Sequence, residues 1–375
     1  MSDLKYQVNP DRSIPWNALP ALPIEKGLYY QLEILEQLGA AKAALGRLQG
    51  RSVVIPNPGM LINTISLQEA KASSAIENIL TTDDDLYKAF SDRNSELVLG
   101  AAKEVLHYRE ALWHGHELIQ GQTKFDQSYL FDIYRHIKQT TDGIRPSFLP
   151  TVIKRVEVAS GREQIVYTPP RGARVVEDKL DNLLNFMNED ELNIDPVLKM
   201  AIGHFQFEAI HPFRDGNGRT GRIFNIHYLV KKGLLDWPVL FLSRYIIDNK
   251  REYYRLLDNV TQAGDWIPWI IYMLKAVEVT ANNTYHKINE IITVKNLILK
   301  TVVVDTNIRR PEALVDMMFT QPFSKVVHFT GKKIYAENTA RNYLNQLCEL
   351  GILEKRVMEG HHYYLNLELY RILGE

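Results

Sequence analysis

The sequence of 375 residues has one cysteine, almost no net charge and no long run of apolar residues. The lone Cys348 excludes an internal disulfide, and its apolar helical setting, YLNQLCELGIL, favours a small buried side chain over a nucleophile. No stretch approaches the roughly 20 apolar residues of a membrane span, so we expect no membrane partner. Because the N-terminus lacks an apolar segment followed by a cleavage site, we predict a cytoplasmic protein.

The net charge limits the kind of nucleic-acid contact, and the length predicts the number of domains. The 44 basic and 45 acidic side chains give a formal charge of −1, so any contact with nucleic acid must be local. The chain exceeds the roughly 100–200 residues of one typical domain, which predicts two or three domains.

Helical patterns dominate the first 300 residues. We predict helices over 26–48, about 61–80, 95–118, 129–139 and much of 177–290. Four prolines between positions 10 and 23 predict an irregular arm before them, and TTDDDL at 81–86 predicts a turn. Alternating residues on both sides of Ser160-Gly161-Arg162 predict one β-hairpin over 151–168.

The last part of the chain differs in kind. DTNIRRP at 305–311 predicts a linker, followed by a helix at PEALVDMMFTQ and a second helix with Asn338 as N-cap and Gly351 as C-cap. A two-stranded ribbon turning at Glu359-Gly360 follows. Two helices and a β-wing are typical of a winged-helix module.

The segment HPFRDGNGRTGR, residues 211–222, has the composition of a phosphate site. Gly216, Asn217 and Gly218 allow backbone N–H groups to converge at the start of a helical pattern, where the helix dipole also favours an anion. Arg219 and Arg222 are three residues apart, so they share one helix face and could clasp further phosphate oxygens.

Two further residues of this segment add chemistry. Asp215 is a hard oxygen ligand, and one carboxylate with phosphate oxygens and water is the usual way to hold magnesium. His211 lies four residues earlier and could remove a proton from a hydroxyl that attacks the bound phosphate. Turn formation alone requires none of the histidine, the acid or the arginines, so we predict a site for a nucleotide and its metal.

This segment matches every signature position of HPFx(D/E)GNGRxxR, and the chain therefore resembles the Fic (Fido) family over roughly residues 60–290. The resemblance implies a mainly α fold with a helical Fic core and a β-hairpin flap. In that family the usual reaction transfers AMP from Mg·ATP to a hydroxyl side chain of a protein and releases pyrophosphate. Gly218 stands where phosphoryl-transferring relatives carry lysine, which favours nucleotidyl transfer.

The resemblance also implies a role for each site residue. His211 would be the general base toward Ser, Thr or Tyr, and Asp215 would hold Mg²⁺. The residues implied to bind ATP are Gly216, Asn217, Gly218, Arg219, Thr220, Gly221 and Arg222. The hairpin 151–168 would be the flap that pairs with an extended segment of the target protein. NKREYYRLL at 249–257 resembles the segment of the adenine wall, so Tyr254 is a candidate, with core packing as the alternative.

A second stretch, SSAIEN at 73–78, resembles the inhibitory motif of the family. That motif is a Ser or Thr, three residues of any type, a Glu and then Gly or Asn, which Ser73, Glu77 and Asn78 satisfy. By itself the stretch is an amphipathic helix with an exposed carboxylate. The resemblance implies that Glu77 pairs with Arg222 in the place of the γ-phosphate and inhibits the enzyme.

The expected organisation has three regions. These are an N-terminal helical region, 1–115, with an inhibitory helix at about 61–80; a Fic catalytic core, 116–295; and a winged-helix domain, 305–375. Two rival functions stay open, an AMP-removing hydrolase in which Glu77 orients water and a nucleotide-sensing DNA-binding regulator. Self-modification and a homodimer are open as well.

The partner of the C-terminal module is also open. Thr339, Arg341 and Asn342 could meet DNA, as in other winged helices. Residues 311–375 hold seven Lys or Arg and eight Asp or Glu, a net of −1 that lacks the basic footprint of a DNA reader. A protein-interaction or dimer-forming role is at least as well supported.

Overall fold

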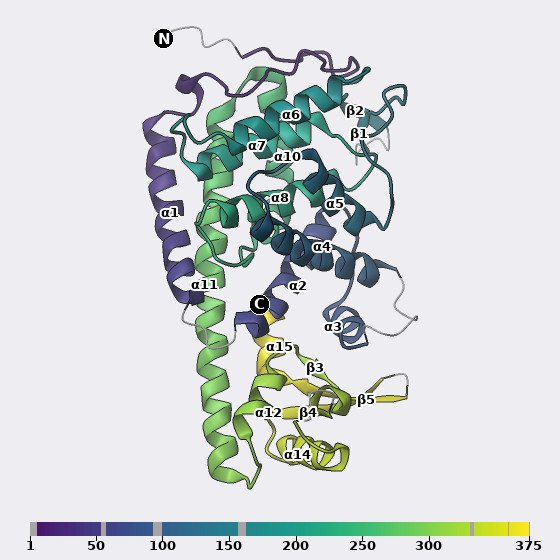
Figure 1. Cartoon of the computed structure of the whole chain (residues 1–375), viewed down its shortest axis with the longest axis vertical. Coiled ribbons are helices and arrows are strands. Elements are labelled where there is room, and N and C mark those ends of the chain that lie inside the picture. Colours follow the sequence, from purple (N-terminus) through teal and green to yellow (C-terminus); the bar gives the residue numbers. More distant parts are fainter. Residues whose placement is uncertain are drawn as a thin grey trace.

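A computed structural model describes residues 6–53, 58–92, 100–156, 163–330, 334–358 and 360–374 of the chain. The described part is mainly helical with two small antiparallel sheets, as predicted (Figure 1). The helices of the main body are α1 (Leu32–Val53), α2 (Pro58–Ile76), α3 (Asp83–Ser91), α4 (Ala101–Gly121), α5 (Gln127–Lys138), α6 (Val175–Asn188), α7 (Pro196–Ile210), α8 (Asn217–Lys231), α9 (Leu242–Asp248), α10 (Lys250–Ala263) and α11 (Trp266–Asp305).

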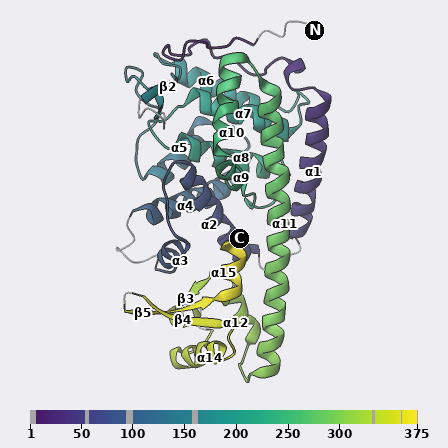
Figure 2. The same ribbon diagram turned by 180° about the vertical axis from the view of Figure 1, so that it is seen from behind.

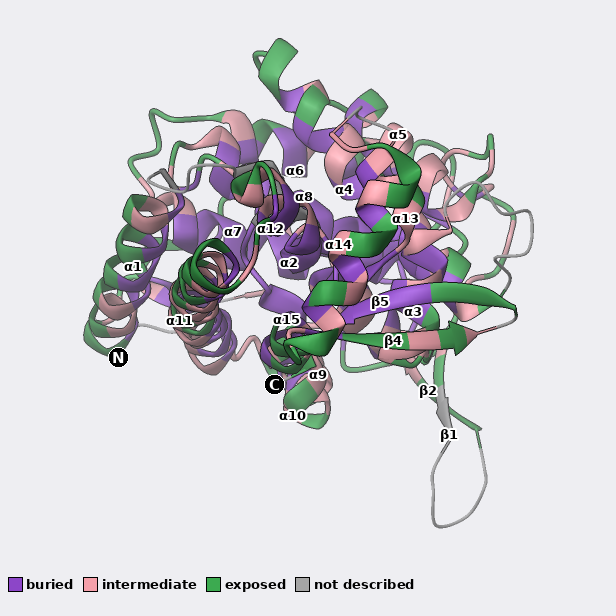
Figure 3. Cartoon of the chain, turned by 90° about the horizontal axis from the view of Figure 1, so that it is seen from below, coloured by how far each residue is buried: buried purple, intermediate pink, exposed green. Residues whose placement is uncertain are grey.

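Helices α7 and α8 form the centre of the body. Every residue of α8 from Asn217 to Val230 is buried, and α7 is nearly as enclosed. A helix that is covered on all sides belongs to the interior of a larger protein. Seen from below, α2 and α8 lie in the buried centre while α1 and α11 turn exposed faces outward (Figure 3). The loop between α7 and α8, which carries the segment 211–216, is therefore held by the core.

Helix α11 runs the length of the molecule and reaches the C-terminal module (Figures 1 and 2). The helical pattern predicted to end near 290 continues to Asp305, and the predicted linker is only 306–310. Ile291, Ile298 and Val302 explain the extension, because they are buried at helical spacing as α11 contacts the module.

Three N-terminal predictions need correction. The first helix begins at Leu32 and not at 26, because 26–28 forms a 3₁₀ turn. Helix α2 ends at Ile76 and not near 80, since Asn78 adopts a left-handed conformation, φ 62°. The acidic turn predicted at 81–86 is the start of α3, where the hydroxyl oxygen of Thr82 accepts from the N–H of Asp85 at 3.1 Å. Acidic residues in a first helical turn also suit the helix dipole.

The predicted hairpin is confirmed in its two strands, β1 (Ile153–Val156) and β2 (Glu163–Tyr167). They pair antiparallel with Ile153 opposite Tyr167 and Val156 opposite Glu163, and the hairpin projects from the body (Figure 3). The predicted turn, Ser160-Gly161-Arg162, lies outside the described residues.

The C-terminal module carries the predicted order of two helices and a wing, with additions. Its elements are α12 (Pro311–Met318), β3 (Phe323–Ser324), α13 (Val326–Thr330), α14 (Glu337–Glu349), β4 (Leu353–Met358), β5 (His361–Asn366) and α15 (Leu367–Gly374). The sheet order is β3-β5-β4. Of the predicted wing turn Glu359-Gly360, Glu359 lies outside the described residues and Gly360 has φ 77°.

The caps of α14 differ from the prediction at its start. Ala336 is the N-cap and Asn338 lies inside the helix. At the other end Gly351, φ 69°, follows the cap, and the N–H of Ile352 donates to the carbonyl of Leu347 at 3.0 Å, a Schellman arrangement. Cys348 is half-buried, in keeping with the predicted structural role. Among the helices of the described ranges, none has the length and apolar character to cross a membrane.

Candidate active site

The loop 211–216 is held rigidly between two buried helices. His211 caps α7 in a left-handed conformation, φ 50°, and Gly216 does the same before α8, φ 75°. The Asn217 side chain accepts from the N–H of Phe213 and donates to its carbonyl, both at 2.8 Å. The Phe213 ring stacks on Tyr134 with centroids 4.1 Å apart. Asn217, predicted to contribute backbone to an anion nest, therefore also fastens the loop with its side chain.

The start of α8 supplies the predicted N–H groups. The first intrahelical bond of α8 is donated by the N–H of Thr220 to the carbonyl of Gly216, at 3.0 Å. The preceding N–H groups, those of Asn217, Gly218 and Arg219, therefore have no acceptor within the helix, which is the condition for binding an anion.

Thr220 and Gly221 face the protein interior. The Thr220 hydroxyl donates to the Gly216 carbonyl at 2.9 Å. A Cβ on Gly221 would lie 2.8 Å from the Phe207 ring and 3.0 Å from Glu208 Oε1, so the glycine lets α8 approach α7 closely. The predicted ATP-binding residues thus divide into backbone donors at the helix start and packing residues behind them.

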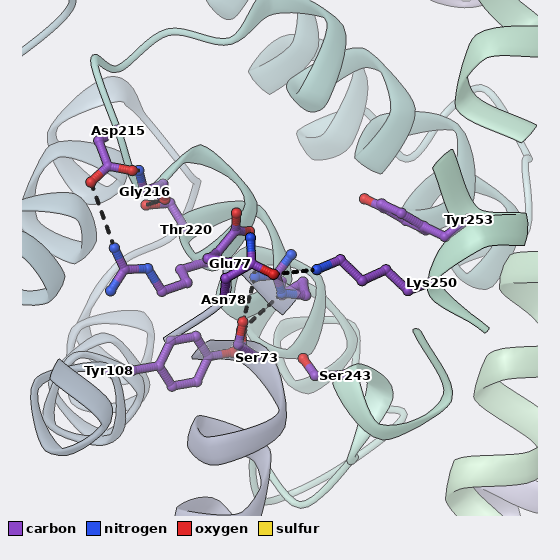
Figure 4. A network of polar contacts seen from close by, with 12 residues as sticks. Ser73, Glu77, Asn78, Tyr108, Asp215, Gly216, Thr220, Ser243, Lys250 and Tyr253 are labelled. Atoms are coloured by element: carbon purple, nitrogen blue, oxygen red, sulfur yellow. Dashed lines mark hydrogen bonds and ion pairs between the residues drawn. The ribbon is translucent and has the colours of Figure 1, made fainter. Parts of the chain in front are cut away.

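Arg222 bonds to two residues of the predicted inhibitory motif, Ser73 and Glu77. Figure 4 shows Ser73, Glu77 and Asn78 close together in this polar network. The side chain of Arg222 is 1% exposed and ion-paired with Glu77, Nη2 to Oε1 2.9 Å. Ser73 accepts twice from the same guanidinium, at 2.8 Å through its hydroxyl and 2.9 Å through its carbonyl. Asn78 accepts from Lys250 Nζ at 3.0 Å. All three residues of the motif are therefore engaged.

The geometry of this network corrects one detail of the prediction. Glu77 does not extend from the helix face of Ser73, because α2 ends at Ile76 and Glu77 lies in the following turn. Its carboxylate lies against the start of α8, since a Cβ on Gly218 would be 2.4 Å from Glu77 Oε1 and 2.7 Å from Arg222 Nη1. The carboxylate of Glu77 thus lies beside the free N–H groups.

Two buried carboxyl groups near Arg222 were missed by sequence reasoning. Burial raises the pKa of Glu69 to about 7, although it accepts from the Ser243 N–H and the Tyr108 hydroxyl, both at 3.0 Å. Burial also raises the pKa of Glu208 to about 7, against the opposing charge of Arg222. The spacing of Glu69, Ser73 and Glu77 in steps of four was the available signal for Glu69.

Arg222 remains charged in this setting. Burial lowers the pKa of its guanidinium, but Glu77, Tyr253, Tyr108 and Glu208 together outweigh burial and hold the pKa above its usual value. A buried cation paired with a carboxylate is equally suited to pair with a phosphate.

Asp215, the predicted metal ligand, is ion-paired with Lys138 at the end of α5. Its Oδ2 lies 2.6 Å from Lys138 Nζ and its Oδ1 accepts from the N–H of Gly216 at 2.7 Å. Burial raises the pKa of Asp215, but the hydrogen bond and charge of Lys138, the N–H of Gly216 and the charge of Arg219 together outweigh it and lower the pKa. The ionised, two-thirds exposed carboxylate suits Mg²⁺ shared with phosphates. The described residues contain no cluster of three His, Cys, Asp or Glu, so no cage of protein ligands alone surrounds it.

The remaining predicted residues border this site. Arg219 is 1% exposed, pairs with Glu104 at 3.0 Å and lies 3.9 Å from Asp215. Tyr254 is half-buried on α10, edge-on to the ring of Tyr253 at 5.2 Å between centroids. Both candidate roles of Tyr254, adenine wall and core packing, are compatible with this position.

His211 is neutral at physiological pH. Burial lowers its pKa to about 4, helped by the charge of Arg145 and opposed by Glu77 and Asp215. An imidazole without its proton is the form that a general base requires.

A neutral histidine, a helix start whose N–H groups lack intrahelical acceptors and a buried arginine have the chemistry of an anion-binding site. Family models match the chain over three ranges: Fic/DOC family N-terminal over 35–117, Fic/DOC family over 124–229, and the C-terminal domain of SoFic-like protein adenylyltransferases over 307–369. The chain belongs to the Fic/DOC family.

Relatives and solved structures are similar over parts of the chain. The protein adenylyltransferase fic-1 of Caenorhabditis elegans is 32% identical over 34% of this chain and 23% of its own length. A probable protein adenylyltransferase of Aquifex aeolicus is 41% identical over 21% of this chain and 24% of its own length. The chain thus spans under a quarter of these curated relatives. A Fic family protein structure from Desulfovibrio desulfuricans G20 shares the fold, with a TM-score of 0.53 and 20% identity over 92% of this chain and 98% of that one.

Proposed function

We propose that this protein is an autoinhibited protein adenylyltransferase. It transfers AMP from Mg·ATP to a Ser, Thr or Tyr hydroxyl of a target protein, or of itself, and releases pyrophosphate. The observation that carries the proposal is the start of α8, whose unpaired N–H groups lie in the same loop-and-helix segment as the neutral His211. The names of the relatives, which are protein adenylyltransferases, point the same way.

In the proposed reaction His211 takes the proton of the acceptor hydroxyl as its oxygen attacks the α-phosphorus. A P–O bond to the acceptor forms, the bond to the β-phosphate breaks, and the electron pair leaves with pyrophosphate. The N–H groups from Asn217 to Arg219 orient the phosphate chain, and Arg219 and Arg222 hold its far end. Mg²⁺ bound by Asp215 and phosphate oxygens would neutralise the charge of the leaving group.

The acceptor is proposed to dock on the flap. The first residues of β2 are exposed, so an extended segment could add beside the hairpin and fix its hydroxyl near His211. We propose that the three regions 1–115, 116–295 and 305–375 act as brake, catalytic core and interaction module. The net charge of −1 over residues 311–375 favours protein contact over DNA contact for the module.

The proposed brake acts through geometry. Glu77 takes the guanidinium of Arg222 and lies beside Gly218, where the end of the phosphate chain belongs. ATP would then bind with its phosphates displaced. A misplacement of about 1 Å in an in-line attack costs on the order of 100-fold in rate, so a modest displacement suffices for inhibition.

The test compares the intact chain with Glu77→Gly, incubated with a cell lysate and ATP labelled at either the α- or the γ-phosphorus. After subtraction of the labelling by lysate alone, which includes γ-label transferred by its own kinases, we expect strong incorporation of the α-label by Glu77→Gly, weak incorporation by the intact chain, and none from the γ-label. Glu77→Gly/His211→Ala is the matched control and should incorporate nothing. Incorporation of the γ-label would identify a kinase, and release of AMP from a previously labelled target without incorporation would identify a hydrolase.

A further inference from the structure

The carbonyl groups at the end of α7 accept from two side chains outside the signature segment. The last carbonyls of a helix lack intrahelical partners, and buried ones need donors from elsewhere. The Tyr167 hydroxyl donates to the carbonyl of Ala209 at 2.7 Å. Arg145 Nε donates to the carbonyl of His211 at 2.7 Å, and its Nη2 donates to that of Ile210 at 3.3 Å.

The same two residues lie at the two ends of the flap in the sequence. Tyr167 is the last residue of β2, and Arg145 precedes β1. Arg145 Nη2 also donates to the carbonyl of Pro170, just after the hairpin, at 2.6 Å, and its backbone N–H donates to the carbonyl of Pro212 at 2.9 Å. One guanidinium therefore joins the base of the flap to the backbone on both sides of the His211 side chain.

Both donors are buried, and the backbone that they hold has a residue in an unfavourable left-handed conformation. Arg145 is 2% exposed and Tyr167 is 8% exposed, so water does not compete freely for these bonds. His211 is in the left-handed region, φ 50°, which ordinary residues adopt only with support from their surroundings.

We propose that Arg145 and Tyr167 are positioning residues that fix the His211 imidazole relative to the flap, and hence relative to the acceptor hydroxyl docked there. The inference rests on the proposed function, because it concerns the geometry of that reaction. Neither side chain contacts the reacting atoms in this proposal; each acts through the backbone at 209–211. Their contribution should fall on the rate of transfer and not on nucleotide affinity.

The charge of Arg145 affects the pKa of His211, and a purely structural role of Arg145 would not predict this effect. It lowers the pKa of His211, in addition to the effect of burial, whereas Glu77 and Asp215 raise that pKa. Glu208 on α7 also faces this region, with its own pKa raised to about 7 by burial. Loss of the Arg145 charge should therefore raise the pKa of His211, and the acidic limb of the rate profile should move to higher pH.

The experiment uses the full chain with Glu77→Gly as the parent. Tyr167→Phe removes one hydroxyl, Arg145→Lys keeps the charge without the fork, and Arg145→Met removes both. The matched control is Arg171→Met, an exposed arginine after the flap. For each we would measure folding by circular dichroism, affinity for a non-hydrolysable Mg·ATP analogue, the rate of α-label incorporation from the lowest pH at which the protein stays folded up to pH 8, and the His211 pKa by imidazole NMR, with His211→Ala for assignment.

We expect a loss of transfer rate of about 10- to 100-fold in Arg145→Met, a smaller loss in Tyr167→Phe, and nucleotide affinity within about twofold of the parent. Arg145→Met should raise the His211 pKa, and Arg145→Lys should restore part of that shift. If folded Tyr167→Phe and Arg145→Met keep the parental rate, or lose rate and nucleotide affinity together without a change in the His211 pKa, the positioning role is wrong. If the parent itself transfers no AMP, the proposed function fails, while the NMR titration still tests the coupling of Arg145 to His211.

Discussion

Lys138 should compete with Mg²⁺ for Asp215, because it forms an ion pair with the carboxylate that is proposed to bind the metal. The pair with Asp215 measures 2.6 Å between Nζ and Oδ2, with the side chains 26% and 66% exposed. Such a partly exposed pair contributes about 0.2–1 kcal/mol. Since tenfold in affinity corresponds to about 1.36 kcal/mol, Lys138→Met should tighten metal binding about 1.4- to 5-fold.

The assay is a titration of Mn²⁺, a paramagnetic substitute for Mg²⁺, followed by electron paramagnetic resonance with a non-hydrolysable ATP analogue. Glu77→Gly would serve as the parent so that the phosphate chain can bind without displacement by Glu77. Lys138→Arg, which keeps the cation, should behave as the parent, and Asp215→Asn should lose the site. Because salt screens exposed charges, the gain in Lys138→Met should shrink as ionic strength rises. Equal or weaker metal binding in Lys138→Met at low salt would refute the competition.

Three further predictions concern other parts of the molecule. The acidic limb of AMP transfer by Glu77→Gly should lie near or below pH 4, since His211 has a pKa of about 4 and acts when neutral; a rate that halves near pH 6.5 would indicate an ordinary histidine. Gly115→Ala should lower the free energy of unfolding by about 1–3 kcal/mol, because the new Cβ would lie 2.4 Å from His227 and from Ile133. Gly46→Ala, with nothing within 4 Å, should instead raise it by about 0.5–1 kcal/mol in the same urea titration. Asp92→Asn removes the negative charge that pairs with Lys325 and weakens the acceptor of the Tyr363 hydroxyl between α3 and the C-terminal module, and should speed limited proteolysis of the module. Glu337→Gln, at an exposed position of α14, should not.

The sequence indicated the site best where its chemistry is local. Residues 211–222 are consecutive, so the nest, the acid and the arginines could be read together from their spacing. The pairing of Glu77 with Arg222 joins residues 145 positions apart and was predicted only because both motifs resembled those of one family. The end of α2 before Glu77 could not be read, since ENIL continues an apolar helical pattern that Asn78 interrupts by its backbone conformation.

The supporting residues left no signal of comparable strength. No motif in the sequence marks Arg145, Lys138 or Glu104. Only the packing of α4 and α5 against α8, and the bonds of Arg145 to the end of α7, bring them to the site. The acidic stretch 81–86 was misread because Thr and Asp favour both turns and helix starts. The linker predicted at 305–311 is close to the observed 306–310, whereas the helical pattern was ended near 290 although α11 continues to Asp305 through buried contacts with the module.

In the proposed function, Glu77 inhibits AMP transfer by pairing with Arg222. The most direct test of this inhibition is the ratio of α-labelled AMP incorporation by Glu77→Gly to that of the intact chain, at equal protein and Mg·ATP concentrations. We expect this ratio to be on the order of 100, and we expect His211→Ala to abolish the incorporation. Unchanged incorporation by a folded, nucleotide-binding Glu77→Gly protein would contradict the proposed inhibition.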